Sequence, residues 1–144
     1  MPGFLSAFDG SRQSIHAFEQ AIELAELKGA KLRVLAVIET PELHEPEERK
    51  AIIEAFRGTL EEAMDKLKPR AADSSVPVTL EIREGHPVDL ILEEIRDQDI
   101  EHVFIGHRGQ KGLIRELLMG SVSRRIADYA PCTVTIARQS GPKR

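Results

Sequence analysis

The feature that most constrains the fold of this 144-residue chain is a regular alternation of short apolar runs with longer segments of helical periodicity. The apolar runs predict five strands, at residues 3–8, 32–38, 76–83, 102–105 and 133–137. The segments of helical spacing predict the helices between them, at residues 14–28, 52–67, 87–98 and 120–129. Strands that alternate with helices in this way form a parallel sheet with right-handed crossovers. The sequence therefore predicts one doubly wound α/β domain over residues 1–144, with helices on both faces of the sheet.

Two of the apolar runs also indicate where their strands lie in the sheet. The run from Leu32 to Ile38 is apolar almost throughout, which is typical of a central strand covered on both faces. The run at 76–83 alternates apolar and polar residues, which predicts a strand with one wetter face near a sheet edge. The proline-containing segments 40–48 and 69–75 are predicted to be loops.

Composition excludes several classes of protein. Hydrophobic residues make up 41% and charged residues 31%, a globular profile. The net charge of -4 argues against a general binder of nucleic acid or of membrane surfaces. No signal-like or membrane-spanning segment is present in the sequence, so we expect a cytoplasmic protein without membrane insertion.

The sequence shows no constellation for metal binding or catalysis. The single Cys132 excludes an internal disulfide and a multi-cysteine metal site, and we expect it to pack as a small apolar side chain. The five histidines lack close metal-ligand spacing, and His107 is interpreted as an exposed loop residue. No Ser-His-Asp order or paired-carboxylate site is evident. We therefore predict no catalytic residue, no metal site and no enzymatic activity.

A glycine-rich segment follows the fourth predicted strand. Gly106, Gly109 and Gly112 fall within seven residues, and Gly120-Ser121 opens the next predicted helix. Between residues 106 and 125 the net charge is +4, which leaves -8 for the rest of the chain. Glycine backbone, a helix N-terminus and focused positive potential together suit a phosphate group. The structural alternative is a tight turn followed by an ordinary helix cap.

The end of the first predicted strand is the second unusual strand end. It continues into Asp9-Gly10-Ser11, a turn and cap signal. Ligands of open parallel sheets bind at the carboxyl ends of strands, where the strand order reverses. Asp9 on its own is more typical of a turn or a helix cap than of a ligand contact.

Four motifs resemble those of the universal stress protein family, and together they cover nearly the whole chain. The segment from Val103 to Ser123 resembles the nucleotide loop of that family, G-x2-G-x9-G-[ST]. Its spacing differs in length, because ten residues, 110–119, separate the second and third glycines where the family pattern has nine. The other matching segments are Phe8-Asp9-Gly10-Ser11, Gly85-His86-Pro87 and Pro131-Cys132-Thr133-Val134.

The resemblance implies a fold, a ligand and an assembly. It implies five parallel strands in the order 3-2-1-4-5 and a regulatory homodimer, commonly formed along the last strand. It also implies ATP binding, in the subgroup of the family that keeps the nucleotide loop. We expect magnesium to accompany the ATP and, since no catalytic base is evident, any hydrolysis to be slow. By position, Asp9 would contact the adenosine, with Ala7 and Phe8 beside it and Val37 near the adenine. The residues that would line the ribose and phosphates are Gly106, Arg108, Gly109, Gly120, Ser121, Val122 and Ser123.

Two other functions remain open at this point. A protein of the same fold could be a protein–protein signalling module, with an unknown regulatory partner, that the longer loop prevents from binding nucleotide. The segment from Ile105 to Gly109 also resembles the GXXG loop of a KH RNA-binding module. That loop joins two helices, whereas a short β-like run precedes Gly106 here, and the acidic remainder disfavours RNA.

Overall fold

The computed structural model describes residues 1–40, 45–107 and 120–138, in which one or two helices separate successive strands. The strands are β1 (Gly3–Phe8), β2 (Lys31–Glu39), β3 (Val78–Gly85), β4 (Ile100–Gly106) and β5 (Thr133–Ala137). The helices are α1 (Arg12–Lys28), α2 (Pro46–Asp65), α3 (Lys68–Ala72), α4 (Pro87–Asp97) and α5 (Ser121–Tyr129). All strand pairs are parallel, and the order is β3-β2-β1-β4-β5. The predicted doubly wound fold and strand order are confirmed.

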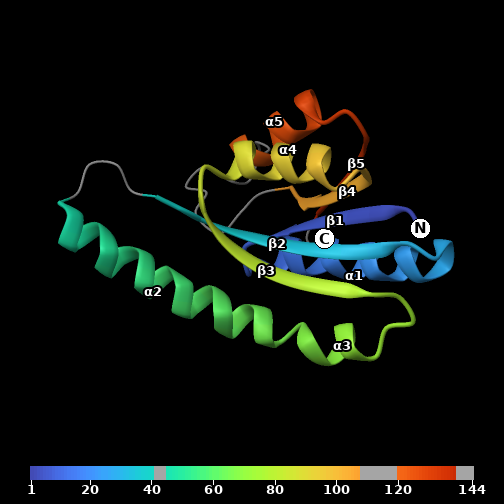
Figure 1. Ribbon diagram of the computed structural model, residues 1–144, viewed down its shortest axis with the longest axis horizontal. Helices are drawn as coiled ribbons and strands as arrows, with labels where there is room; N and C mark the ends of the chain where they lie inside the picture. Colours follow the sequence, from blue (N-terminus) through green and yellow to red (C-terminus); the bar gives the residue numbers. More distant parts are fainter. Residues whose placement is uncertain (41–44, 108–119, 139–144) are drawn as a thin grey trace, which may run out of the picture.

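Helices cover both faces of the sheet and enclose two apolar cores (Figure 1). Alternate residues of β1 enter different cores because successive side chains of a strand point to opposite faces. Phe4 and Phe8 pack in the core that includes residues of α1 and α2. Leu5 and Ala7 pack in the core that includes residues of α4 and α5. The strand that the sequence pattern placed near an edge, β3, is an edge strand.

Helix α2 corrects the first predicted loop. The segment 40–48 was expected to be a loop, but α2 begins at Pro46. Proline fits the first helical position because the missing N–H has no partner within the helix there. Glu45 and Glu48 form a capping box around the start of the helix. The expected loop is therefore wrong from Pro46 onward.

The second predicted loop also contains a helix. Residues 69–75 were expected to be a loop, whereas α3 occupies Lys68–Ala72, with Pro69 in its first turn. A proline there interrupts no hydrogen bond of the helix, so its presence does not exclude one. None of the helices within the described ranges is both long and apolar enough to cross a bilayer.

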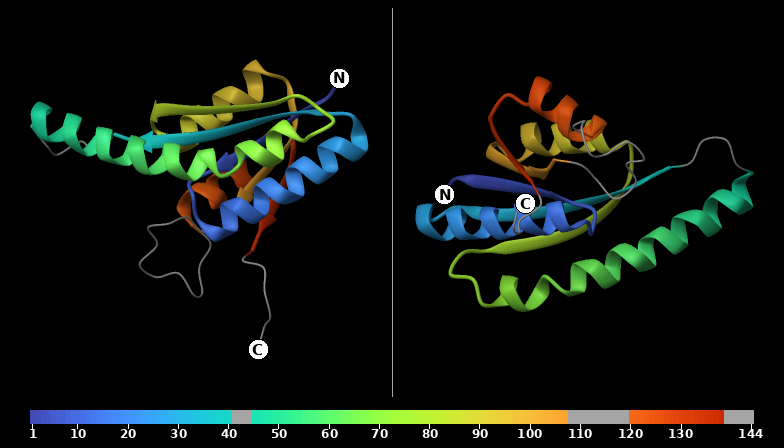
Figure 2. Two further views of the ribbon diagram at one scale, coloured as in Figure 1. Left: turned by 90° about the horizontal axis from the view of Figure 1, so that it is seen from below. Right: turned by 180° about the vertical axis from the view of Figure 1, so that it is seen from behind.

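Helix α2 covers its part of the sheet incompletely. Of its 20 residues, only Met64, near the carboxyl end, is buried. The views in Figures 1 and 2 show that its amino-terminal half extends beyond the sheet. The helix is therefore anchored mainly at one end.

A cluster of charged side chains joins β2, β3 and α4 on the face of the sheet opposite to α2. The side chain of Glu94 in α4 is 7% exposed and forms ion pairs with Arg33 of β2 and Arg83 of β3. Arg33 also contacts Glu81 of β3, at 3.2 Å between Nη2 and Oε1. One buried carboxylate therefore ties the edge strand β3 to its neighbour and to α4.

Candidate functional site

The candidate site lies where the carboxyl ends of β1 and β4 meet. These strands are neighbours, with Ser6 in register with Phe104. The strand order reverses between them: β2 and β3 are added on the outer side of β1, whereas β5 is added on the outer side of β4. Helix α1 begins shortly after β1, and α5 is the next described helix after β4. This geometry is the usual position of a ligand crevice in an open parallel sheet.

The turn from β1 to α1 is held by a compact set of hydrogen bonds. The N–H of Ser11 donates to Oδ1 of Asp9 at 2.9 Å, and Gly10 has a φ of 86°. Ser11 is the N-cap of α1, and its Oγ accepts from the N–H of Ser14 at 3.2 Å. The Ser14 hydroxyl donates to the Ser11 carbonyl oxygen at 2.9 Å. Asp9 thus acts as a turn residue, as its sequence context indicated, and its contact with a ligand stays a prediction.

Gly106, at the end of β4, is required by the packing of α1. A Cβ added at this position would lie 3.0 Å from the carbonyl carbon and Cβ of Gln13 and from the nitrogen of Ser14. The first turn of α1 therefore occupies the space that a side chain would fill. Gln13 and Ser14 are residues of this region that the sequence reasoning missed, because nothing in their local pattern indicates a contact with β4. The predicted role of Gly106 toward the ribose and phosphates remains untested.

The amino terminus of α5 is fastened to the end of β4. The N–H of Gly120 donates to the carbonyl oxygen of His107 at 2.9 Å. The hydroxyl of Ser123, which is 3% exposed, donates to the same oxygen at 2.7 Å. The N-cap residue is Gly120, so no N-cap side chain accepts from the first-turn amides of α5, and Ser121 is exposed. Such amides are donors for an anion.

His107 corrects a sequence-based expectation. The residue was interpreted as an exposed loop histidine, but it is only 5% exposed. Its N–H donates to the carbonyl oxygen of Ala137 at 2.7 Å, which extends the pairing of β4 with β5 by one residue. The backbone of His107 therefore links β4, β5 and α5, and burial follows from that position.

The residues predicted to surround the adenosine divide between the two faces of the sheet. Phe8 is in register with Ala36, so Val37 lies one position beyond the end of β1 on the neighbouring strand. Val37 is half-buried and packs with the same core as Ala7. The side chain of Phe8 lies in the opposite core. Ala7 and Val37 therefore share a face, which the side chain of Phe8 does not reach.

The structure brings most of the predicted site residues together at the carboxyl ends of the strands. Asp9 follows the last residue of β1, Gly106 ends the adjacent strand β4, and Val37 lies on β2 beside β1. Residues 120–123 are the N-cap and the first turn of α5. Two predicted residues, Arg108 and Gly109, lie outside the described residues, as does the segment 110–119 that makes the loop longer than the family pattern. Their roles stay predictions.

Two alternative kinds of site find no support in the described ranges. No group of three or more His, Cys, Asp or Glu side chains in those ranges is arranged to hold a metal ion. The KH interpretation is wrong in its key feature, since the residues that precede the GXXG-like segment form β4 and not a helix.

Cys132 is half-buried, and burial raises the pKa of its thiol, which favours the unreactive protonated form.

Sequence and structure comparisons agree on one group of proteins. Residues 4–138 match the Universal stress protein family. Universal stress protein YxiE of Bacillus subtilis is 29% identical over 147 residues, which cover 93% of this chain and 97% of that protein. Universal stress protein MJ0531 of Methanocaldococcus jannaschii is 30% identical over 134 residues, or 91% of this chain and 78% of that protein.

Solved structures show the same fold. Universal stress protein UspA from Lactobacillus plantarum superposes with a TM-score of 0.83 at 25% identity, covering 95% of this chain and 97% of that chain. An Arabidopsis thaliana family member with AMP bound gives a TM-score of 0.68 at 18% identity, covering 98% and 94% of the two chains. A universal stress protein in complex with cAMP gives 0.72 at 21% identity, covering 96% and 98%.

Proposed function

The chain belongs to the universal stress protein family, and on that premise we propose that it is a regulatory protein that binds an adenine nucleotide. The proposed ligand is ATP with magnesium, bound where β1 and β4 end, with at most slow hydrolysis. The observation that carries the proposal is the start of α5. Its first-turn amides have no N-cap side chain, and hydrogen bonds to His107 fasten them to the end of β4. Such a helix terminus stabilises a phosphate through its N–H groups and its dipole.

Other observations support the same ligand. The AMP and cAMP complexes of two structural neighbours are consistent with an adenine nucleotide. Asp9, just after β1, and Val37 on β2 lie at the carboxyl ends of the strands, as does the amino terminus of α5. The proposed orientation therefore places the adenosine near β1 and β2 and the phosphates near α5. Isothermal titration with ATP and Mg²⁺ tests it, and no heat at millimolar nucleotide would contradict binding.

Ser121→Pro tests the role of the backbone at the start of α5. Proline at the first helical position removes one amide donor without disturbing the helix. The preceding residue, Gly120, has φ -63° and ψ 152°, an extended conformation that a following proline accepts. We expect ATP affinity to fall about tenfold, the effect of losing one hydrogen bond to a charged group. Thermal unfolding should be unchanged.

Ser121→Ala is the matched control for this variant. It removes the exposed hydroxyl and keeps the amide, so near-normal affinity is expected if the backbone binds the phosphate. Equal ATP affinity in Ser121→Pro and the native protein, measured by titration calorimetry, would show that this amide does not face the ligand.

The proposed assembly is a homodimer formed along β5. The strand Thr133–Ala137 lies at one edge of the sheet and contains no charged residue. The opposite edge strand, β3, carries Glu81, Arg83 and Glu84. Uncharged edge strands are prone to pair with another chain, whereas charged ones are protected from it. This contrast supports β5 as the strand that meets a second copy.

Thr135→Lys tests the dimer. Thr135 is the middle residue of β5, so pairing about a twofold axis there would place two lysines opposite each other, which is destabilising. We expect the mass measured by light scattering at micromolar concentration to fall from that of a dimer to that of a monomer, with the circular dichroism spectrum retained. Thr79→Lys on the opposite edge strand should leave the dimer intact. A monomeric native protein would contradict the proposal.

A further inference from the structure

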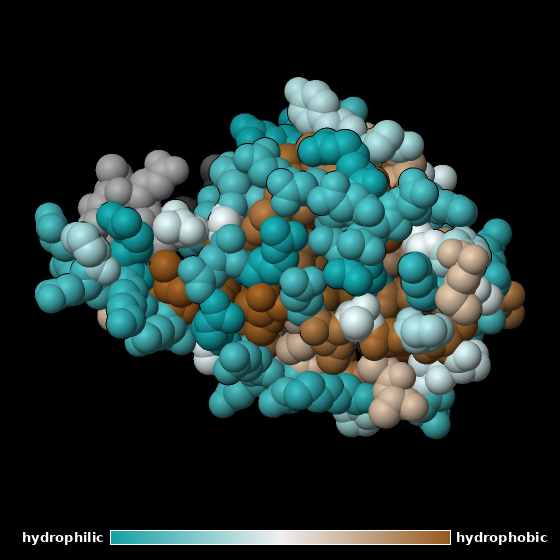
Figure 3. All heavy atoms as spheres, viewed as in Figure 1, coloured by the Kyte–Doolittle hydropathy of each residue, from teal (hydrophilic) through white to brown (hydrophobic). Residues whose placement is uncertain are grey.

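Helix α2 consists of two parts that differ in how firmly they are held. At its carboxyl end, Met64 and the following Leu67 pack in the core and are 4% and 5% exposed. The amino-terminal part, residues 46–57, contains no buried residue. Figure 3 shows apolar side chains at the surface between this helix and β3, where coverage is incomplete. Since helices in proteins owe most of their stability to packing, the amino-terminal part is the weakly attached one.

The carboxyl-terminal part of α2 is also fixed through α3, which follows it. Arg70 of α3 donates two hydrogen bonds to the carboxylate of Glu26 in α1, at 3.0 Å from Nη1 to Oε2 and 2.7 Å from Nη2 to Oε1. The N–H of Ser75 donates to the same carboxylate at 3.3 Å. The Arg70 hydrogen bonds lower the pKa of Glu26 to about 2. The segment 60–72 is therefore docked on α1 and on the sheet.

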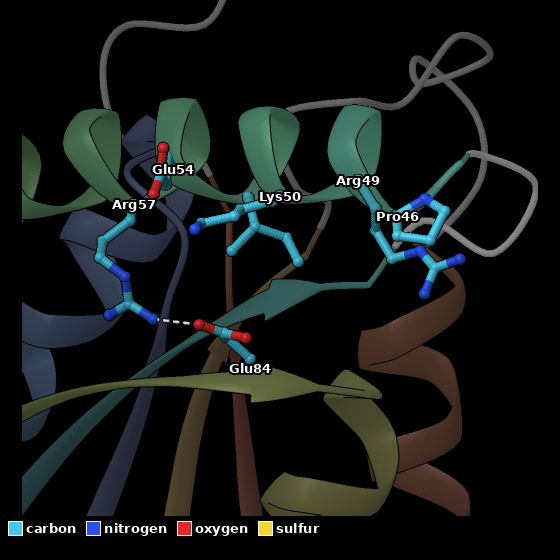
Figure 4. Close-up of a pocket in the computed structure, with 7 residues that line it drawn as sticks. Pro46, Arg49, Lys50, Glu54, Arg57 and Glu84 are labelled. Carbon is cyan, nitrogen blue, oxygen red and sulfur yellow. Dashed lines mark hydrogen bonds and ion pairs between the residues drawn. The ribbon is translucent and has the colours of Figure 1, made fainter.

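The amino-terminal part of α2 borders an open hollow of about 350 Å³. The residues that line it include Ile53 of α2 and Glu84 of β3. Arg57, at the end of this part, reaches across and forms an ion pair with Glu84 (Figure 4). The two side chains of the pair are 36% and 45% exposed, so water and salt weaken their attraction. The ion pair is a weak connection between this part of the helix and β3.

The junction between the two parts has two features that weaken a helix. Gly58 lies within the helix, where glycine costs about 0.5–1 kcal/mol relative to alanine. The hydroxyl of the next residue, Thr59, donates to the carbonyl oxygen of Ala55 at 3.2 Å. Such a hydrogen bond to the residue four positions earlier often bends a helix. The helix is therefore easiest to bend at Gly58-Thr59.

The amino terminus of α2, by contrast, has strong local helix signals. Glu45 and Glu48 form a capping box, and Pro46 lies in the first turn. Glu47 and Glu48 place negative charge in that turn, which is favourable beside the amino end of the helix dipole. Because the amino-terminal part also continues a docked helix, it needs no new nucleus to stay helical. It can therefore leave the sheet without unravelling.

We propose that α2 has a hinge at Gly58-Thr59, about which residues 46–57 swing away from β3 as a helical arm. The segment 60–72 stays docked, and the Arg57–Glu84 ion pair is the latch that holds the arm closed. Opening breaks this partly exposed pair and uncovers side chains that water already reaches in part, such as Ile53 and Phe56. The open form is a minor population of the free protein, and it does not depend on nucleotide binding.

Spin labels measure the swing in the full-length protein. In a Cys132→Ser background, one label is placed on α1 by Gln20→Cys and the other on the arm by Glu47→Cys, both at exposed positions. Pulsed electron resonance should give one main distance and a minor second distance. With the second label on the docked part, by Glu62→Cys, a single narrow distance is expected. A single narrow distance for both label pairs in every variant would overturn the proposal.

The latch is tested by Glu84→Gln, with Glu81→Gln as its matched control. Both glutamates lie on β3, but Glu81 pairs with Arg33 on the other face of the sheet. Loss of the exposed ion pair should raise the ratio of open to closed arm about threefold in Glu84→Gln. Glu81→Gln should leave that ratio unchanged. An equal rise in both variants, or none in Glu84→Gln, would contradict the latch.

The hinge is tested by the double variant Gly58→Ala/Thr59→Val. Alanine favours a regular helix, and valine keeps the branched shape of threonine but removes the hydroxyl that bonds to Ala55. The ratio of open to closed arm should fall about threefold, also when Glu84→Gln is present. Backbone chemical shifts of residues 47–57 should stay helical in every variant. Loss of those helical shifts on opening would show that the arm unravels, which would overturn the hinge.

Discussion

Gly106→Val is expected to destabilise the protein by about 3 kcal/mol and to reduce ATP binding strongly. The first atom of the new side chain would lie 3.0 Å from two atoms of Gln13 and from the nitrogen of Ser14. Two of these are backbone atoms, so relief requires movement of the whole first turn of α1. Ser11, the N-cap of that turn, donates its N–H to Asp9, so the proposed adenosine contact would move with the turn. Urea unfolding and titration calorimetry measure the two effects.

The control for this variant is another glycine of the same chain. Gly58 lies within α2, is exposed and has no atom within 4 Å of an added Cβ. Gly58→Ala should therefore raise stability by about 0.5–1 kcal/mol, because alanine favours a helix interior over glycine. An unfolding midpoint of Gly106→Val equal to that of the native protein would contradict the close packing of α1 on β4.

Glu94→Ala is expected to lower the free energy of unfolding by about 2 kcal/mol, below the range for fully buried ion pairs. The side chain of Glu94 is 7% exposed, whereas its partners Arg33 and Arg83 are 25% and 34% exposed. Removal of the carboxylate leaves two guanidinium groups close to an apolar layer, but water reaches both of them and limits the loss. Urea unfolding at neutral pH measures the change.

A neighbouring glutamate provides the matched comparison. Glu93 contacts Arg83 at 3.5 Å, but its side chain is 49% exposed. Glu93→Ala should change stability by less than about 0.5 kcal/mol. Similar losses in the two variants would contradict a special role for the buried carboxylate. Hydrogen exchange adds a local readout, since Glu94→Ala should accelerate exchange in β3, the edge strand that Glu94 helps to hold.

Most of the fold could be predicted because its signals are local. Alternation of short apolar runs with helical periods indicated each strand found in the described residues, and the pattern at 76–83 indicated an edge strand. The errors concern proline. Pro46 and Pro69 were interpreted as loop residues, yet each lies in the first turn of a helix. Proline breaks helix interiors but is tolerated in first turns, so its presence alone did not distinguish the two cases.

The candidate site was predicted less completely. The sequence indicated the turn at Asp9 and the helix start at Gly120, because turns and caps have local signatures. The burial of His107 was missed, as was the use of the Ser123 hydroxyl to bind the His107 carbonyl oxygen. That contact joins residues 16 positions apart. Local periodicity carries no information about such a pairing.

By itself, the sequence determined the alternating elements, the class of sheet and the glycine-rich, positively charged segment embedded in an acidic chain. Only the tertiary structure decided how the strand ends are used. It showed that the missing side chain of Gly106 makes room for α1, and that α2 leaves β3 partly open. The physical reason is that periodicity and capping act within a few residues. Close approach of backbones and incomplete coverage of a core depend on elements that meet only after the chain has folded.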